Sequence, residues 1–492
     1  MSWLSPMGPI GLVWTVAVSL LVTTYVYFWW NVVKATAHQH VNREYIDDDM
    51  LRTALALARG DERTHRFLIQ ITTKGGALAV VERGIDNVLD GIVRYPALCD
   101  VVRVEVITEN GEEVQALEAR YAGAAIRVEP ILLPPDYRTP QGTALKARAL
   151  HYMVERHRST PDDCYVVHYD EESVLTPDNL ARLVHRLLSR PVGISEGMIS
   201  YGLDWDQATL LNKAMESARP FGCHECYSVM TSPPPLHLHG SNLVVRQDLE
   251  NEIGWDIGNL DGSALVAEDL VFGLMAYLRY GPGEFGWHYA EMIEQPPFTV
   301  KDGYKQRERW VFGALQALAH VRSLPGWGQL RLRDRLRIAV IIRVRVLTYA
   351  LGFPISLLAL GVNSVVATMV ALESVRVDQW QGSWPEWTVD GVLTVCGIGL
   401  WLGATQLGLG YNLRHSGLGV RQRVRDHLLV LLVTPIAGLV DTAGPLVAVL
   451  KWIAGIREVT WRPTPKSAPV TRTGVGRARS HPAPITQSAS VR

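Results

Sequence analysis

The sequence predicts an α/β domain with a Rossmann-like sheet, inserted between transmembrane helices and joined to them by an interfacial amphipathic helix. Residues 1–33 contain no Lys, Arg, Asp or Glu and include an apolar run long enough to cross a bilayer. From 65 to 327, strand-like runs alternate with helical ones. Apolar runs return at 346–372 and 391–411, flanked by arginines. These three observations place a soluble domain between membrane segments.

Composition supports a membrane protein with a soluble part. The chain has 492 residues, of which 48% are hydrophobic and only 20% charged. Its formal net charge of -1 gives no overall attraction to nucleic acid, so no nucleic-acid partner is expected. The 5 cysteines are scattered and odd in number, which argues against a disulfide framework and favours a reducing compartment.

The N-terminal segment 1–33 is predicted to be a transmembrane anchor. A cleaved signal peptide is the alternative, because residues 35–37 resemble a cleavage site. The missing basic region and the long apolar stretch favour the anchor. Because Lys34 and Arg43 follow the span and no charge precedes it, the connector at 34–64 should be cytosolic.

The α/β domain at 65–327 is expected to have a largely parallel sheet with helices on both faces. Its predicted strands are Arg66–Ile71, Val101–Ile107 and Cys164–Val167. In such sheets ligands bind at the carboxyl ends of strands. The loops at Thr72, Glu109 and Asp170 all follow strands, so we expect them to converge on one site.

Asp170 and Glu172 lie two residues apart at the end of a strand. Two carboxylates so placed can share one divalent cation, and hard oxygen ligands suit Mg²⁺ or Mn²⁺. The alternative is that these acids only begin a loop, since residues 176–178 (Thr-Pro-Asp) form a good helix start directly afterwards.

Two later patterns carry further candidate residues. Glu268 and Asp269 open a helix, where they act either as a general base and its neighbour or only as stabilisers of the helix N-terminus. Gln306, Arg309 and Trp310 fall on one helical face. This face suits a diphosphate and a sugar ring, although surface Arg–Trp stacking is the alternative.

Two weaker patterns lie between 191 and 262. Cys223 and Cys226 form a single Cys-x-x-Cys pair, for which reduced, partly buried thiols are favoured over a zinc site. His239, Gly240 and Ser241 precede an apolar strand. A glycine there permits close approach of the backbone to a ligand, or simply makes a turn.

The remainder of the chain predicts alternating membrane and cytosolic segments. The expected order is an interfacial amphipathic helix at 328–345, a span at 346–372, an external loop at 373–390, a span at 391–411, a basic cytosolic loop at 412–427, a transmembrane segment or re-entrant hairpin at 428–453, a segment at 454–466 and a disordered tail at 467–492. The protein is thus expected in the cell membrane as a multi-pass protein with a cytoplasmic α/β domain.

These patterns follow one another along the chain in the order that one protein family shows. Asp170-x-Glu172, Glu268-Asp269 and Gln306-x-x-Arg309-Trp310, flanked by membrane helices, resemble membrane glycosyltransferases of family 2, which have a GT-A nucleotide-binding domain. Residues 73–75, 106–110, 134–139, 146–150, 168–172, 232–245, 266–269 and 297–310 are similar to the Egghead-like β-1,4-mannosyltransferases. The resemblance covers roughly residues 65–460. The ordered set of motifs is more specific evidence for the family than any single motif in it.

The resemblance implies inverting transfer of mannose from GDP-mannose to the 4-hydroxyl of a sugar on a membrane glycolipid. By matched position, Asp269 would be the catalytic base and Asp170 and Glu172 would hold the metal. The donor would meet Thr72, Thr73, Glu109, Lys146, Asp170, Gln306 and Arg309, and the acceptor would meet Glu268 and Trp310. Residues 454–466 faintly resemble the gating loop of polysaccharide synthases, but Arg457 and Arg462 replace the usual aromatic residue and lysine of that loop.

Two other function classes remain open. A processive synthase would build a β-glycan from UDP-glucose or GDP-mannose, but few spans are predicted for a translocating channel. A membrane scaffold with a degenerate transferase domain would bind a donor without transferring sugar. The joint presence of Asp170, Asp269 and Arg309 argues against this scaffold.

Overall fold

The computed structural model describes residues 45–159, 163–231, 239–371, 384–458 and 464–466, with part of 19–39. The predicted anchor at 1–33 and the first part of the predicted loop at 373–390 lie largely outside the described residues. The predicted tail at 467–492 lies wholly outside them.

An eight-stranded sheet forms the centre of the α/β domain, in the order β3-β2-β1-β4-β7-β6-β10-β5. The strands are β1 Arg66–Thr72, β2 Val102–Thr108, β3 Val128–Leu132, β4 Cys164–Asp170, β5 Val174–Leu175, β6 Ile194–Ser200, β7 Leu243–Arg246 and β10 Phe285–Ile293, and β8 Asn259–Leu260 pairs with β9 Ser263–Ala264 in a separate small sheet.

The sheet is mixed, which corrects the prediction of a largely parallel one. β1 pairs in parallel with β2 and β4, and β2 with β3, as expected. β7, however, runs antiparallel to both β4 and β6, and β5 antiparallel to β10. A short apolar run in the sequence predicts a buried strand but not the direction in which it pairs.

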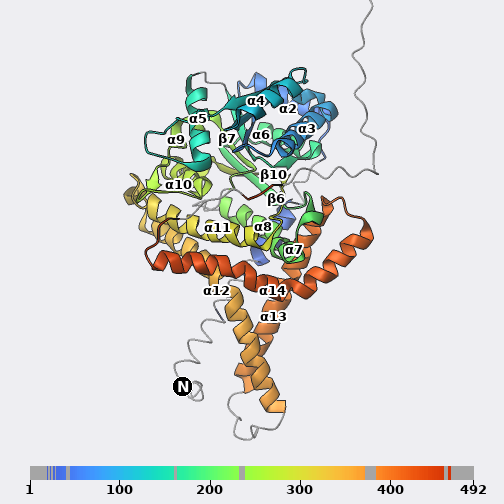
Figure 1. The fold of residues 1–492 in the computed structure, drawn as a ribbon, viewed down its shortest axis with the longest axis vertical. Coiled ribbons are helices and arrows are strands. Elements are labelled where there is room, and N and C mark those ends of the chain that lie inside the picture. The colour runs from blue at the N-terminus through green and yellow to red at the C-terminus, as the bar shows by residue number, and fades with distance from the viewer. Residues whose placement is uncertain are drawn as a thin grey trace, which may run out of the picture.

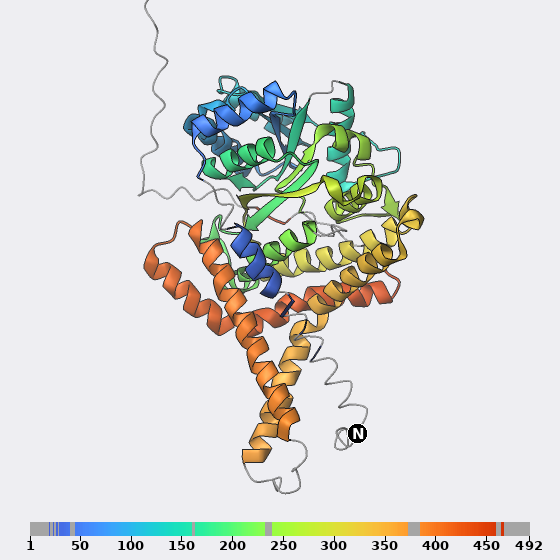
Figure 2. The same ribbon diagram turned by 180° about the vertical axis from the view of Figure 1, so that it is seen from behind.

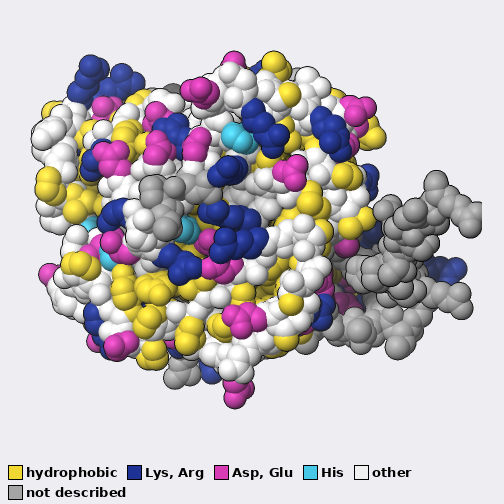
Figure 3. Space-filling view, turned by 90° about the horizontal axis from the view of Figure 1, so that it is seen from above, with side chains coloured by type: hydrophobic (Ala, Val, Ile, Leu, Met, Phe, Trp, Pro, Cys, Tyr) yellow, Lys and Arg dark blue, Asp and Glu magenta, His cyan; other side chains and the backbone are white. Residues whose placement is uncertain are grey.

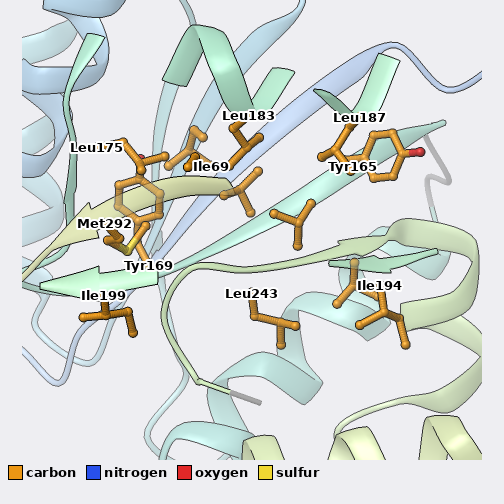
Figure 4. Packing of buried hydrophobic residues seen from close by; sticks show 14 of the residues in the cluster. Ile69, Tyr165, Tyr169, Leu175, Leu183, Leu187, Ile194, Ile199, Leu243 and Met292 are labelled. Carbon is orange, nitrogen blue, oxygen red and sulfur yellow. The ribbon is translucent and has the colours of Figure 1, made fainter. Parts of the chain in front are cut away.

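Helices pack over the sheet through apolar faces. α6 Pro177–Ser189 starts at Thr176, whose side chain accepts from the N–H of Asn179, as the Thr-Pro-Asp pattern predicted. Figure 4 shows Leu183 and Leu187 of α6 facing buried residues of β1 and β4, including Ile69. The other helices of this domain are α2 Asp48–Gly60, α3 Leu78–Arg94, α4 Gly111–Tyr121, α5 Leu145–Ser159, α9 Gln247–Ile253 and α10 Glu268–Tyr280.

A helical layer lies below the sheet in Figure 1 and consists of α7 Leu210–Ser217, α8 Arg219–Met230 and α11 Val300–Val321. Below it, α14 Val420–Ile453 runs across the base of the domain, and α12 Leu332–Ala371 and α13 Trp384–Arg414 project away from the domain together (Figures 1 and 2). Leu332–Leu358 and Val420–Ile453 are long and apolar enough to cross a membrane by length and composition.

Three membrane-segment boundaries differ from expectation. The predicted interfacial helix at 328–345 and span at 346–372 are parts of one helix, α12. The second part of the predicted loop at 373–390 belongs to α13. Residues 428–453 lie in the continuous helix α14, so they do not form the hairpin that the prolines suggested. Pro435 and Pro445 lie inside α14, and each removes one backbone donor. The helix continues past both residues.

α14 has two different faces along its length. Val430, Ala437 and Ala448 are buried against the domain, where α14 packs on α7 and α11. Leu432 is 74% exposed and Ile453 75% exposed on the other side. One packed face and one exposed apolar face are typical of a helix lying between a soluble domain and a lipid surface.

The upper face of the domain differs from this base. Lys, Arg, Asp and Glu side chains are interspersed over it in Figure 3. Mixed charge of this kind is the ordinary surface of a protein in water.

Candidate active site

One cavity of about 1490 Å³ contains the candidate site. Its wall includes residues from the sheet, from α10 and α11, and from the helices at the base of the domain. Every site residue predicted from the sequence lines it: Thr72, Thr73, Glu109, Lys146, Asp170, Glu172, Glu268, Asp269, Gln306, Arg309 and Trp310.

The first side of the cavity, the strand-end wall, comprises Thr72, Thr73, Glu109, Asp170 and Glu172. Parallel pairing sets Thr72 opposite Asp170 on β4 and opposite Ile107 on β2. The carboxyl ends of these strands therefore meet at one edge, which is where ligands bind in such sheets.

Hydrogen bonds fix the strand-end wall. The Thr73 hydroxyl donates to Oε2 of Glu171 over 2.7 Å, and Nη2 of Arg148 donates to Oε1 of Glu109 over 2.6 Å. Gly75 follows with φ +97°, and a Cβ there would lie 2.7 Å from that of Asn110. A glycine is needed at this turn for both its backbone conformation and its close contact.

Lys146 of α5 joins this wall to the centre of the cavity. Its Nζ forms an ion pair with Asp170 and donates to the carbonyl of Gly240 over 3.0 Å. Burial alone would disfavour the charged form of Asp170, but the Lys146 ammonium outweighs burial and lowers the pKa of this carboxyl. Asp170 is therefore ionised at neutral pH.

The opposite side, the helical wall, comprises Glu268, Asp269, Gln306, Arg309 and Trp310. Asp269 lies in the first turn of α10, and its Oδ1 accepts from the N–H of Leu270 over 2.8 Å. Burial, followed by the charge of Glu268, raises the pKa of Asp269 to about 7. A carboxyl with such a pKa can take up a proton near neutral pH.

Gly240 brings the backbone close to both walls. A Cβ added there would lie 3.2 Å from Nζ of Lys146 and 3.6 Å from Oδ2 of Asp269. The backbone at Gly240 therefore lies so close to the cation and the candidate base that one added carbon would contact both. This arrangement matches the close approach considered for the His-Gly-Ser sequence.

Trp310 is partly buried, and the guanidinium of Arg219 lies 4.1 Å from its ring centroid. The stacking partner thus comes from α8, far from Arg309 in the sequence. This contact covers one part of the ring with a cation. Trp310 nevertheless lines the cavity together with Arg309.

A buried ionic cluster supports the helical wall from below. Arg307 is fully buried, and its Nη2 lies 2.6 Å from Oε1 of Glu216 while its Nε donates to Oδ1 of Asp441 over 2.5 Å. This cluster ties α7, α11 and α14 together. In the sequence Asp441 only interrupts an apolar run, so pattern analysis missed its role as an ion-pair partner.

The two carboxylates predicted to bind metal each have a lysine partner. Asp170 pairs with Lys146, and Glu172 pairs with Lys466, whose side chain is 11% exposed. Burial and the charge of Glu172 raise the pKa of nearby Glu294 to about 7. Within the described residues no three His, Cys, Asp or Glu side chains are grouped as metal ligands.

Carboxylate oxygens at the cavity wall nevertheless fit Mg²⁺ or Mn²⁺ chemically, because such ions take one or two protein carboxylates together with phosphate oxygens. Asp170 and Glu172 are the side chains that would hold the ion. Sequence analysis did not single out Lys466 or Glu294, and only the fold brings them to Glu172.

Cys223 and Cys226 are buried free thiols. Sγ of Cys226 lies 3.5 Å from Nε2 of His239, whose Nδ1 lies 2.7 Å from Oε1 of Glu196. Burial raises the pKa of Cys226 to about 12, so it is a neutral thiol.

A family model described as "Glycosyl transferase family group 2" matches residues 165–386. This range includes Asp170 and Glu172 of the strand-end wall and all of the helical wall. Over this range, which is less than half of its length, the chain is similar to glycosyltransferases of family 2.

Two proteins that are similar to this chain are both named as β-1,4-mannosyltransferases. "Beta-1,4-mannosyltransferase egh" of Drosophila melanogaster is 29% identical over 204 residues, which are 40% of this chain and 43% of the relative. "Beta-1,4-mannosyltransferase bre-3" of Caenorhabditis elegans is 26% identical over 317 residues, 63% of this chain and 64% of the relative. The match thus spans less than two thirds of the length of each of these relatives.

The TarS 1–349 structure from S. aureus aligns with 79% of this chain and 92% of its own, at 11% identity and a TM-score of 0.33.

Proposed function

We propose that this chain is an inverting mannosyltransferase. It would transfer mannose from GDP-mannose to the 4-hydroxyl of a lipid-linked sugar at the cytosolic membrane face, using a GT-A type nucleotide-binding domain. The observation that carries the proposal is the placement of Asp269, with a pKa of about 7, in the same cavity as Lys146 and Asp170. The names of the 26–29% identical relatives support the choice of mannose.

Inverting transfer needs one base and no enzyme nucleophile. Asp269 takes the proton from the acceptor hydroxyl as its oxygen attacks the anomeric carbon and the bond from that carbon to the diphosphate breaks. Glu268, next to Asp269, raises its proton affinity through its negative charge. The reacting sugars would meet in the cavity beside Asp269, which Lys146 and Gly240 also line.

The leaving diphosphate needs positive charge. Lys146 lies at the strand-end wall, and Arg309 lines the same cavity from α11. Arginine can bind phosphate oxygens through two parallel donors. A divalent ion held by Asp170 and Glu172 would supply further charge neutralisation to the diphosphate. Thr72, Thr73 and Glu109 at the same wall are proposed to contact the nucleoside, and Gln306 the donor.

The test is a donor screen with the purified full chain in lipid nanodiscs. GDP-mannose, UDP-glucose and UDP-N-acetylglucosamine are each offered with glucosyl and mannosyl lipid acceptors, and products are sized by mass spectrometry. We expect one added mannose from GDP-mannose in the presence of Mg²⁺ or Mn²⁺. A long polymer would establish the processive synthase instead, and donor binding without any product would establish the scaffold.

A further inference from the structure

The cavity continues past the candidate catalytic residues into the helices at the base of the domain. This continuation, here called the apolar arm, is lined by side chains of α12, α13 and α14 and by Tyr27 and Trp29 near the N-terminus. Its apolar members are Val340, Ile341, Val344, Phe353, Trp401, Ala404 and Gly438, and Arg337, Arg345 and Asp441 of the same helices also line the cavity. One continuous space therefore joins the candidate site to a part with a mainly apolar lining.

Contacts of Trp310 connect the helices of the candidate site with α12. Arg219 covers this ring and donates to the Tyr349 hydroxyl of α12 over 3.4 Å. These residues line the cavity together with Asp269 and Arg309 and with the apolar side chains of the arm. A cavity with both kinds of lining suits a ligand with a polar head and a hydrocarbon tail.

The far wall of the arm is tightly packed. The rings of Phe353 and Trp401 lie 4.8 Å apart between α12 and α13. A Cβ on Gly438 of α14 would lie 2.7 Å from the Phe353 ring. The arm is thus bounded by three helices in direct contact.

The helices that line the arm also expose apolar side chains outwards. Leu347 on α12 is 48% exposed, Leu358 is 59% exposed and Leu407 on α13 is 53% exposed. Water would disfavour such a surface, whereas lipid chains would cover it. The arm therefore lies among helices whose outer faces suit a lipid environment, and a lipid chain is the occupant of matching chemistry.

We propose that the apolar arm binds the hydrocarbon chain of a lipid-linked sugar acceptor while the sugar lies in the part of the cavity that Asp269 lines. This inference rests on the proposed function for its acceptor, and it adds the place where the chain of that acceptor binds. It assigns recognition of the lipid to α12, α13 and α14 and recognition of the donor to the sheet.

The first experiment compares two acceptors with GDP-mannose as donor, hexadecyl β-D-glucoside and ethyl β-D-glucoside. Val344 lines the arm and is 46% exposed, whereas Leu347, three residues later, is 48% exposed and does not line it. Val344→Trp should fill the arm and raise KM for the hexadecyl acceptor about tenfold, equivalent to losing burial of roughly two methylene groups. It should leave the ethyl acceptor unchanged, and Leu347→Trp should leave both unchanged. Equal effects of Val344→Trp on both acceptors would overturn the inference.

A second measurement does not depend on transfer. A hexadecyl glucoside with a diazirine in its chain is crosslinked to the full chain in nanodiscs, and labelled peptides are mapped by mass spectrometry. We expect labelling at the arm residues, reduced by Val344→Trp and not by Leu347→Trp. Labelling only on outer positions such as Leu347, insensitive to both variants, would overturn the inference. Absent transfer with arm labelling intact would overturn the proposed function alone.

Discussion

The strand-end wall and the helical wall of the cavity are built in different ways. The strand-end wall is positioned by adjacent parallel strands, whose register sets Thr72 opposite Asp170. The helical wall depends on contacts between segments far apart in the chain, such as Arg307 with Asp441. The first wall follows from local strand patterns, whereas the second exists only once α7, α11 and α14 have packed together.

The two walls also differ in electrostatics. At the strand-end wall, Lys146 lowers the pKa of Asp170 and keeps it charged. At the helical wall, burial and Glu268 raise the pKa of Asp269 to about 7. Carboxyls with pKa values moved in opposite directions suit different tasks, the charged one for cation binding and the other for proton transfer.

The substitution Asp269→Asn tests most directly whether the two walls have different tasks. We expect transfer to fall by about 10²–10⁴-fold, because the amide cannot accept the hydroxyl proton. Binding of GDP with Mn²⁺, measured by calorimetry, should stay close to that of the unchanged protein because it depends on the other wall. Asp170→Ala should instead weaken the metal-dependent binding of GDP. Near-normal turnover of Asp269→Asn would remove this residue from the mechanism.

Arg307→Leu tests whether the helical wall depends on the buried ionic cluster. It leaves the Glu216 carboxylate without its closest cation, so we expect a loss of about 3–5 kcal/mol in stability. Thermal unfolding in detergent measures this loss. Lys305→Met, which breaks an ion pair of a side chain that is 58% exposed, should cost less than about 1 kcal/mol. Similar melting temperatures for the two variants would contradict the role given to the cluster.

The pH dependence of transfer tests the raised pKa of Asp269. The base must be ionised, so kcat/KM should rise with pH and level off above about 7, falling about tenfold per pH unit below it. Glu268→Gln removes the neighbouring negative charge and should move the midpoint to lower pH. Glu294, whose pKa is also about 7, provides the control, because Glu294→Gln should keep the midpoint. A midpoint that follows Glu294 would reassign the titrating group.

Lys466→Met tests the charge balance of the strand-end wall and should have the smallest effect. Lys466 pairs with Glu172, so a divalent cation at this carboxylate competes with the ammonium group. We expect Mn²⁺ to bind severalfold more tightly to the variant, as measured by electron paramagnetic resonance, while Lys466→Arg should bind as the unchanged chain does. Weaker Mn²⁺ binding to Lys466→Met would show that the lysine assists the metal site.

The sequence by itself determined the candidate residues of both walls and the strands β1, β2 and β4. Strand ends, helix starts and helical faces are local patterns, and the family resemblance joined them in order. Tertiary structure alone decided the direction of β7, the continuity of α14 and the partners of Asp441, Glu172 and Trp310. Local patterns depend on neighbouring residues along the chain, whereas strand direction and ion-pair partners depend on packing between segments that the sequence holds far apart.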